Sequence, residues 1–161
     1  MDEVDRLVEA WGRERPELDP APMQVFSRVT RLARHLDRER RQAFAAHALE
    51  PWEFDVLSAL RRSGEPYELS PGRLLHETLV TSGTMTNRVD RLVARRLVGR
   101  RADPTDRRGV LVRLTPRGRA AVDAALDALL GSERELLAAL STRERDRLGA
   151  LLRVVIAPFD A

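Results

Sequence analysis

The chain has 161 residues, which is enough for one domain with a hydrophobic core, and its net charge is only +3. It contains no cysteine, and this excludes disulfides, thiolate metal sites and thiol redox chemistry. No apolar run is long enough to cross a bilayer and the first residues are acidic, so we expect a cytoplasmic protein with no membrane partner.

The first third of the sequence predicts two helices. The first is short and amphipathic and should end before Pro16. Its apolar residues recur at helical spacing at Val4, Leu7, Val8 and Trp11. Residues 17–22 contain two prolines and form a linker, and a longer helix follows with an apolar stripe over residues 25–36.

The middle of the sequence predicts three further helices. A helix over residues 51–62 begins with a proline, which is favoured in the first turn. Ser70, which also precedes a proline, can cap a short helix. After a brief turn, Thr81 or Ser82 can cap a helix that runs to about Arg96. A short helix, a turn and a longer helix in this order are typical of a helix-turn-helix.

A β-hairpin is predicted directly after this motif, over residues 97–118. Its return strand alternates as a half-buried strand should, at Val110, Val112 and Leu114. A hairpin that follows a helix-turn-helix is a wing. We therefore expect a mainly α protein, a winged helix-turn-helix with a two-stranded wing.

The C-terminal part predicts more helices. Thr115 caps a helix through Leu130, another helical stretch follows Gly131, and Ser141 opens a final helix with a capping box. The long terminal helices are candidates for dimerisation. We expect one continuous domain in three segments: N-terminal helices over 1–48, the winged motif over 49–115 and C-terminal helices over 116–161.

Positive charge is concentrated in one block of the sequence. Between Leu79 and Arg119 there are 11 arginines and 3 acidic residues, a local charge of +8, whereas the rest of the chain carries −5. Such a block is expected of a nucleic-acid-binding element, although a solvated charged face would look similar. Because the block coincides with the second helix of the motif and the wing, the pattern favours DNA.

The helix over 81–96 has one apolar face and one polar face. Hydroxyl and amide groups near its start can bond base edges or phosphates, and its arginines can neutralise the DNA backbone. Capping is the alternative role for Ser82, and a solvated surface is the alternative for Arg95. The helical residues that we expect to contact DNA are Ser82, Thr84, Thr86, Asn87, Arg91 and Arg95.

The tip of the wing provides a second set of candidate DNA contacts. Arg107 and Arg108 can enter the minor groove, where narrow A·T-rich stretches attract guanidinium groups. Asp106 can orient a neighbouring arginine by pairing with it, or it can simply form the turn.

Two stretches of this region resemble the MarR family of transcription regulators. The segment "DRRGVLVRLT" (106–115) resembles that family's wing, and "VTSGTMTNRVDRLVARRLVGR" (80–100) resembles its recognition helix and first wing strand. The resemblance implies a homodimer, assembled through N- and C-terminal helices, that binds pseudo-palindromic double-stranded DNA and most often represses. The apolar stripes of the terminal helices agree with a two-fold dimer that matches two half-sites.

The added N-terminal helix, with "AWGRERPELDP" (10–20), is similar to the branch of the family that responds to urate and related small anions. That resemblance implies a ligand site formed by Trp11, Asp55, Arg88 and Arg100. From the residues alone, Trp11 can equally be a packing residue. Asp55, Arg88 and Arg100 can equally form a structural ion pair. The apolar neighbours of Asp55 predict a buried carboxylate that needs a partner, and strand alternation places Arg100 on the inward side.

Other functions find little support in the sequence. The three histidines, His35, His47 and His76, lie on separate segments without catalytic or metal-ligand spacing, and no phosphate-binding glycine loop is present. We therefore expect no enzyme activity, no catalytic or metal site and no cofactor. Three alternatives stay open: a metal sensor whose histidines meet in space, a winged helix used for protein contacts, and a regulator that binds a different aromatic or carboxylic acid.

Overall fold

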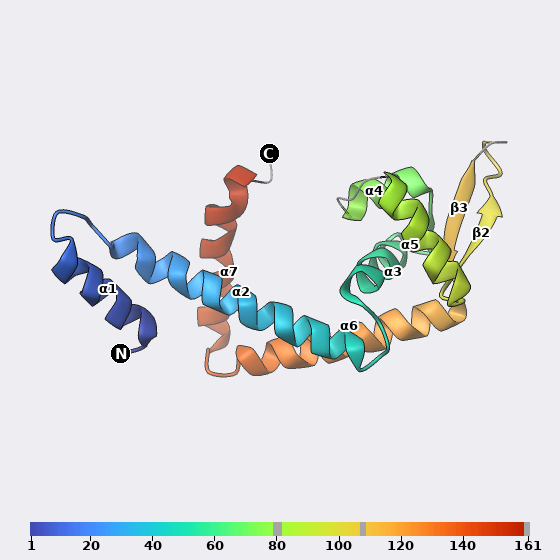
Figure 1. Cartoon of the computed structure of the whole chain (residues 1–161). Helices are drawn as coiled ribbons and strands as arrows, with labels where there is room; N and C mark the ends of the chain where they lie inside the picture. Colours follow the sequence, from blue (N-terminus) through green and yellow to red (C-terminus); the bar gives the residue numbers. More distant parts are fainter. Residues whose placement is uncertain (79–81, 107–108, 160–161) are drawn as a thin grey trace. The chain divides into compact units, whose positions relative to one another are not determined.

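A computed structural model describes residues 1–78, 82–106 and 109–159. The protein is mainly helical with one small antiparallel sheet, as the sequence predicts (Figure 1). The chain divides into two compact units, Met1–Gln42 and Ala43–Ala161. No helix in the described part of the chain is both long enough and apolar enough to span a membrane.

The first unit contains α1 (Glu3–Glu14) and most of α2 (Ala21–Ala45), in agreement with the two predicted helices. Asp2 caps α1, because its carboxylate accepts hydrogen bonds from the backbone N–H groups of Val4 at 2.8 Å and Asp5 at 3.0 Å. Val4 is the buried residue of α1 and lies against α2 in a shallow groove.

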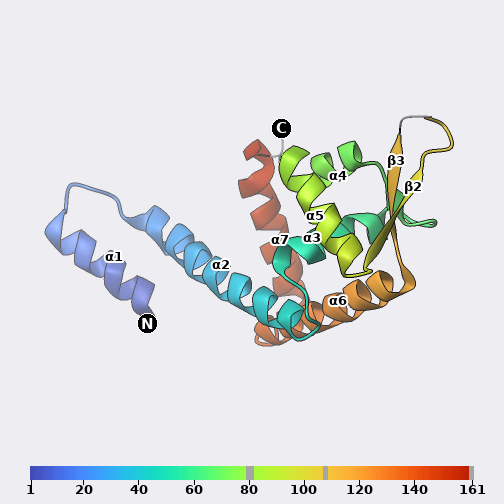
Figure 2. The same ribbon diagram turned by 45° about the vertical axis from the view of Figure 1, so that its right-hand side comes forward.

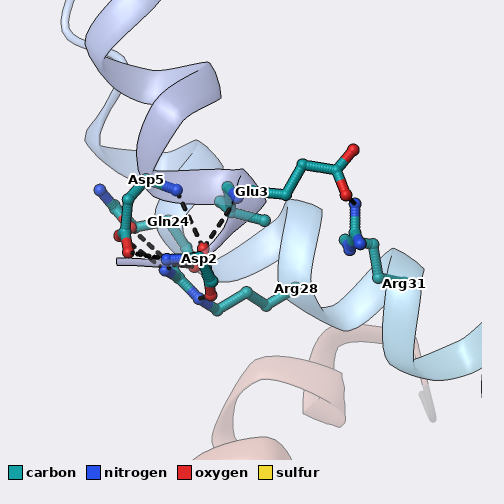
Figure 3. A network of polar contacts seen from close by, with 7 residues as sticks. Asp2, Glu3, Asp5, Gln24, Arg28 and Arg31 are labelled. Atoms are coloured by element: carbon teal, nitrogen blue, oxygen red, sulfur yellow. Dashed lines mark hydrogen bonds and ion pairs between the residues drawn. The ribbon is translucent and has the colours of Figure 1, made fainter.

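Ion pairs hold the start of α1 against α2 (Figure 3). Arg28 binds Asp2 through Nε at 2.9 Å and Asp5 through Nη2 at 2.7 Å, and Arg31 pairs with Glu3 at 2.6 Å. The pKa of each aspartate is lowered, first by the backbone N–H of the other end of the capping box and then by Arg28.

The core of the second unit is built around α3 (Pro51–Arg62). Half of its twelve residues are buried, because the helix is covered on several sides. Two helices pack against it, α4 (Pro71–Thr78) and α6 (Pro116–Leu136). The next helix, α5 (Ser82–Ala94), packs against α4 and reaches α3 through its side chains (Figure 2). Helices α3, α4 and α5 contain the predicted helix-turn-helix. The apolar stripe expected on α5 is buried at Met85, Val89 and Leu92.

The wing consists of β2 (Val98–Ala102) and β3 (Val110–Leu114), which pair antiparallel with Arg100 opposite Val112. A third strand that the sequence analysis did not predict, β1 (Glu68–Leu69), pairs with the other edge of β3. Two residues are too few to produce the alternation by which a strand is recognised in a sequence.

Two long helices follow the wing, α6 (Pro116–Leu136) and α7 (Thr142–Ile156). Thr115 caps α6 and Ser141 forms the predicted capping box with Glu144. The break expected at Gly131 was wrong, because α6 continues through it. A glycine costs a helix only about 1 kcal/mol relative to alanine, and the good helix formers around Gly131 compensate for that.

Candidate nucleic-acid interface

One face of α5 is buried and the other is exposed. Met85 and Val89 are at most 2 % exposed, whereas Thr84, Thr86 and Asn87 lie on the exposed face, as predicted. Ser82 is the first residue of the helix, and its side chain lies outside the described part of the structure. The start of α5 therefore presents small polar side chains and backbone N–H groups at the surface.

An open hollow of about 580 Å³ lies between the start of α3 and the exposed face of α5. Glu50 and Trp52 form one side of it. The other side belongs to α5 and consists of Gly83, Thr84, Asn87, Arg88 and Arg91. The hollow thus contains three of the residues expected to contact DNA, and it is polar and rich in hydrogen-bond donors.

Arg91 remains at the surface, with its side chain 54 % exposed. Its guanidinium carbon lies 4.7 Å from the centre of the Trp52 ring, and its Nη2 donates to Glu50 Oε1 at 3.2 Å. The contact with the ring orients the guanidinium, and the exposed ion pair with Glu50 is weak enough to be exchanged for phosphate.

Arg95 is held differently. It forms an ion pair with Glu53, which is only 1 % exposed, and its Nη2 donates to the carbonyl oxygen of Ala48 at 2.6 Å. The same Glu53 carboxylate accepts the backbone N–H of Glu50 at 2.9 Å. These contacts give Arg95 a role in packing α5 on α3, and its contact with DNA stays a prediction.

An ion pair with β1 and hydrogen bonds in the loop after β2 stabilise the wing. Arg101 Nε donates to Glu68 Oε2 at 2.8 Å, and this bond lowers the pKa of Glu68. Asp103 accepts two hydrogen bonds from Thr105, at 2.8 and 2.7 Å, and these lower the pKa of its carboxyl group. These contacts link β2 to β1 and close the turn that follows β2.

The predicted contacts at the tip are only partly described. Asp106 is exposed, and its backbone carbonyl accepts the N–H of Gly109 at 2.8 Å, which agrees with a turn. Arg107 and Arg108 lie outside the described residues, so their contact with a minor groove stays a prediction.

Three of the four predicted ligand residues lie in the second unit. Arg88 is half-buried with its guanidinium carbon 5.5 Å from the centre of the Trp52 ring. Arg100 pairs with Asp90 of α5 at 2.7 Å, but it is exposed, so the expectation of an inward side chain was wrong: the core covers Val98 at the start of β2 and not the residues after it. Asp55 is exposed, so the expectation of a buried carboxylate at this position was wrong. The buried acid of α3 is Glu53, which lies about 200° around the helix from Asp55.

Trp11, the fourth predicted ligand residue, belongs to the first unit. Its side chain is 46 % exposed. Together with Arg15, Leu18 and Met23 it borders a hollow of about 420 Å³ where α1 turns toward α2. An exposed indole beside an arginine can stack on a planar molecule, and it can also simply cover the apolar turn.

The histidines give no support to a metal sensor. No group of three or more His, Cys, Asp or Glu residues that could hold a metal ion is found among residues 1–78, 82–106 and 109–159, which include all three histidines. His35 instead lies 2.8 Å from the guanidinium of Arg38 on the same helix.

Comparison with known proteins identifies the group to which this winged helix is related. Residues 49–109 match the model of the MarR family. The chain is 35% identical to the HTH-type transcriptional regulator PecS of Dickeya dadantii over 93% of its own length and 90% of that protein. The chain belongs to the MarR family. It is also 34% identical to the HTH-type transcriptional repressor NicR of Pseudomonas putida, over 86% of this chain and 89% of NicR.

Solved MarR structures have the same fold. Apo MarR from E. coli superposes with a TM-score of 0.68 at 27% identity, covering 82% of this chain and 96% of MarR. A cysteine-to-serine mutant of MarR complexed with operator DNA has a TM-score of 0.68 at 28% identity, covering 86% and 98%. This chain is accordingly a DNA-binding transcription regulator and not an enzyme, as the sequence predicts.

Proposed function

We propose that the protein is a homodimeric repressor that binds an inverted-repeat operator and is released by a small anionic ligand. The observation that carries the proposal is the exposed polar face of α5, on which Thr84, Thr86 and Asn87 lie beside Arg88 and Arg91. The repressor NicR is a relative, and the MarR mutant with the same fold was solved with operator DNA.

In this proposal, different groups supply sequence recognition and affinity. Asn87 and the hydroxyls at the start of α5, including that of Ser82, bond base edges in the major groove. Arg91 contacts phosphate, and Arg107 and Arg108 of the wing enter the adjacent minor groove. Because the polar side chains are short, the N-terminal end of α5 can approach the bases closely.

The terminal helices supply the dimer interface. No side chain of α7 is buried, although the helix carries a row of large apolar residues that are 37 to 57 % exposed: Leu148, Leu151, Leu152, Val155 and Ile156. On α2, Phe26, Val29 and Leu32 are exposed by 40 to 55 %. A second copy of the chain can cover such faces, and its two-fold symmetry presents two α5 helices to two half-sites.

A small anion such as urate is the proposed releasing ligand. Arg88 and Arg100 are the cations that would hold it, in competition with their present contacts to Trp52 and Asp90. Arg88 lies on α5, and Arg100 contacts α5 through Asp90. A ligand that binds more tightly when α5 is shifted therefore lowers the affinity of the protein for DNA. Trp11 and Asp55 are the further residues whose substitution should change ligand binding.

Calorimetric titration with urate, xanthine and salicylate tests this ligand class. We expect a saturable signal with one of the three and its loss in Arg88→Ala. An unchanged response in that variant removes the site assignment. Binding of salicylate but not of urate would favour the alternative, a regulator of aromatic carboxylic acids.

Footprinting of the DNA upstream of the protein's own gene tests the regulator itself. We expect protection of an inverted repeat, with an affinity that falls steeply as salt rises but keeps its preference for that site. Addition of the ligand found by calorimetry should remove the protection. Protection without any site preference would contradict the proposal.

A further inference from the structure

We propose that Trp52 is a positioning residue for DNA recognition, which holds the guanidinium groups of Arg88 and Arg91 in the orientation that meets DNA. The proposal rests on the proposed function, because it concerns the same face of α5. Trp52 itself contacts no DNA in this account and acts through the two arginines.

The indole of Trp52 is itself fixed from two sides. It lies in the first turn of α3, half-buried, and packs against the hydrophobic core. Its Nε1–H donates to the carboxylate of Glu50, and that carboxylate also accepts a hydrogen bond from Arg91. Core packing and a hydrogen bond therefore both hold the ring beside α5.

Both arginines meet this one ring. The guanidinium carbons lie 4.7 Å (Arg91) and 5.5 Å (Arg88) from the ring centre, and residues three apart on a helix share a side. The next arginine along α5, Arg95, is held by the buried Glu53 instead. Trp52 thus contacts the two arginines that border the same hollow as Thr84 and Asn87.

Contact with an aromatic face suits this purpose better than an ion pair does. A guanidinium stacks through its flat face, while its N–H donors lie in its plane and stay directed outward. The contact limits the many rotamers of arginine without neutralising the charge that attracts phosphate. The expected result is a preorganised pair of cations at the rim of the reading surface.

Substitution of Trp52 tests the inference, with fluorescence anisotropy on the operator found by footprinting. We expect Trp52→Leu to weaken operator binding about fivefold to tenfold, because two cation–π contacts are lost. Trp52→Phe keeps an aromatic face and should bind within about twofold of the wild type. Equal losses in the two variants would overturn the inference.

A double-mutant cycle separates positioning from a structural role. In an Arg88→Ala/Arg91→Ala background, Trp52→Leu should cause no further loss of affinity. An additive loss would mean that Trp52 acts through the fold, and it would overturn the inference while the regulator stands. A wild-type chain that binds no operator would instead remove the proposed function, and this inference with it.

Fluorescence keeps the inference testable if Trp52→Leu does not fold. A Trp11→Phe chain has Trp52 as its single tryptophan. Its emission should change when operator DNA saturates the protein, because phosphate then replaces water around the guanidinium groups that contact the indole. Unchanged emission at saturation would overturn the inference.

Discussion

The helices of the winged motif and the terminal helices use similar apolar residues in different ways. In α3, half of the residues are buried, whereas α7 buries none and α2 buries only Phe44. An apolar stripe therefore shows that a helix is amphipathic, but it does not show whether the same chain covers it. If a second copy covers the terminal helices, core residues should control folding and terminal apolar residues should control assembly and DNA binding.

The largest expected effect comes from a charge placed on the exposed stripe of α7. Leu151, which is 57 % exposed, becomes buried in the proposed dimer, and Leu151→Arg should leave a folded monomer. A monomer engages one half-site at a time, so operator affinity should fall by about two to four orders of magnitude. Sedimentation and anisotropy measure the two effects.

Asp146→Arg is the matched control for that variant. Asp146 is exposed on the same helix, about 150° around it from the centre of the apolar stripe, so the variant should remain a dimer and keep its operator affinity. Dimers of Leu151→Arg with normal affinity would mean that α7 does not form the interface.

The next effect contrasts two arginines of α5. Arg95→Ala leaves the buried Glu53 carboxylate without its cation, so the free energy of unfolding should fall by about 3 kcal/mol. Arg91→Ala removes an exposed pair and should cost at most about 1 kcal/mol, yet it should weaken DNA binding. Urea unfolding measures the stability of both variants and anisotropy measures their DNA affinity. A larger loss of stability in Arg91→Ala than in Arg95→Ala would contradict the prediction.

Alanine substitutions at two glycines of α6 should change the stability of the protein by an intermediate amount and in opposite directions. A Cβ at Gly118 would lie 1.9 Å from the backbone oxygen of Leu97, so Gly118→Ala should destabilise the core by about 1–3 kcal/mol. A Cβ at Gly131 meets nothing within 4 Å, and Gly131→Ala should stabilise the helix by about 0.5–1 kcal/mol. Thermal unfolding measures both. Equal effects would mean that the start of α6 does not lie against the backbone of Leu97.

The smallest effect concerns acid and the start of α1 (Figure 3). The folded-state pKa values of Asp2 and Asp5 lie below the ordinary 3.8. Their contribution to the free energy of unfolding is therefore complete above that pH, and it is lost as the pH falls through the lowered pKa values. Arg28→Gln should move this loss to higher pH.

The emission of Trp11 in a Trp52→Phe chain follows this change. Arg41→Gln, which removes an exposed pair with Asp37 inside α2, is the control and should leave the acid transition where it is. An Arg28→Gln curve that coincides with the wild type would show that the network does not hold α1.

Much of the fold follows from the sequence because each signal is local. The helix starts at Thr115 and Ser141 can be recognised from capping residues close together in the sequence. The buried stripe of α5 can be recognised from the helical spacing of its apolar residues. The exposed polar residues Thr84 and Asn87 were predictable for the same reason. The break at Gly131 was predicted wrongly because the helix around it decides whether a glycine ends it.

The pairing of arginines could not be predicted from their position on the helix. Arg91 and Arg95 are four residues apart and have similar neighbours in sequence, but one meets an exposed glutamate and the other a buried one. The partners lie directly before α3 and in its first turn, more than 40 residues away. The packing of α3 decides which of its carboxylates is buried. The sequence does not show that packing, and for this reason it predicted a buried Asp55, whereas the buried residue is Glu53.

The measurement that tests the regulator most directly is an anisotropy titration on three duplexes: the protected inverted repeat, one half-site alone and a scrambled sequence, each over a range of salt concentrations. The account predicts two chains per inverted repeat, much weaker binding to the half-site and scrambled duplexes, and a steep loss of affinity with salt. Equal affinity for all three duplexes, or one chain per inverted repeat, would contradict it.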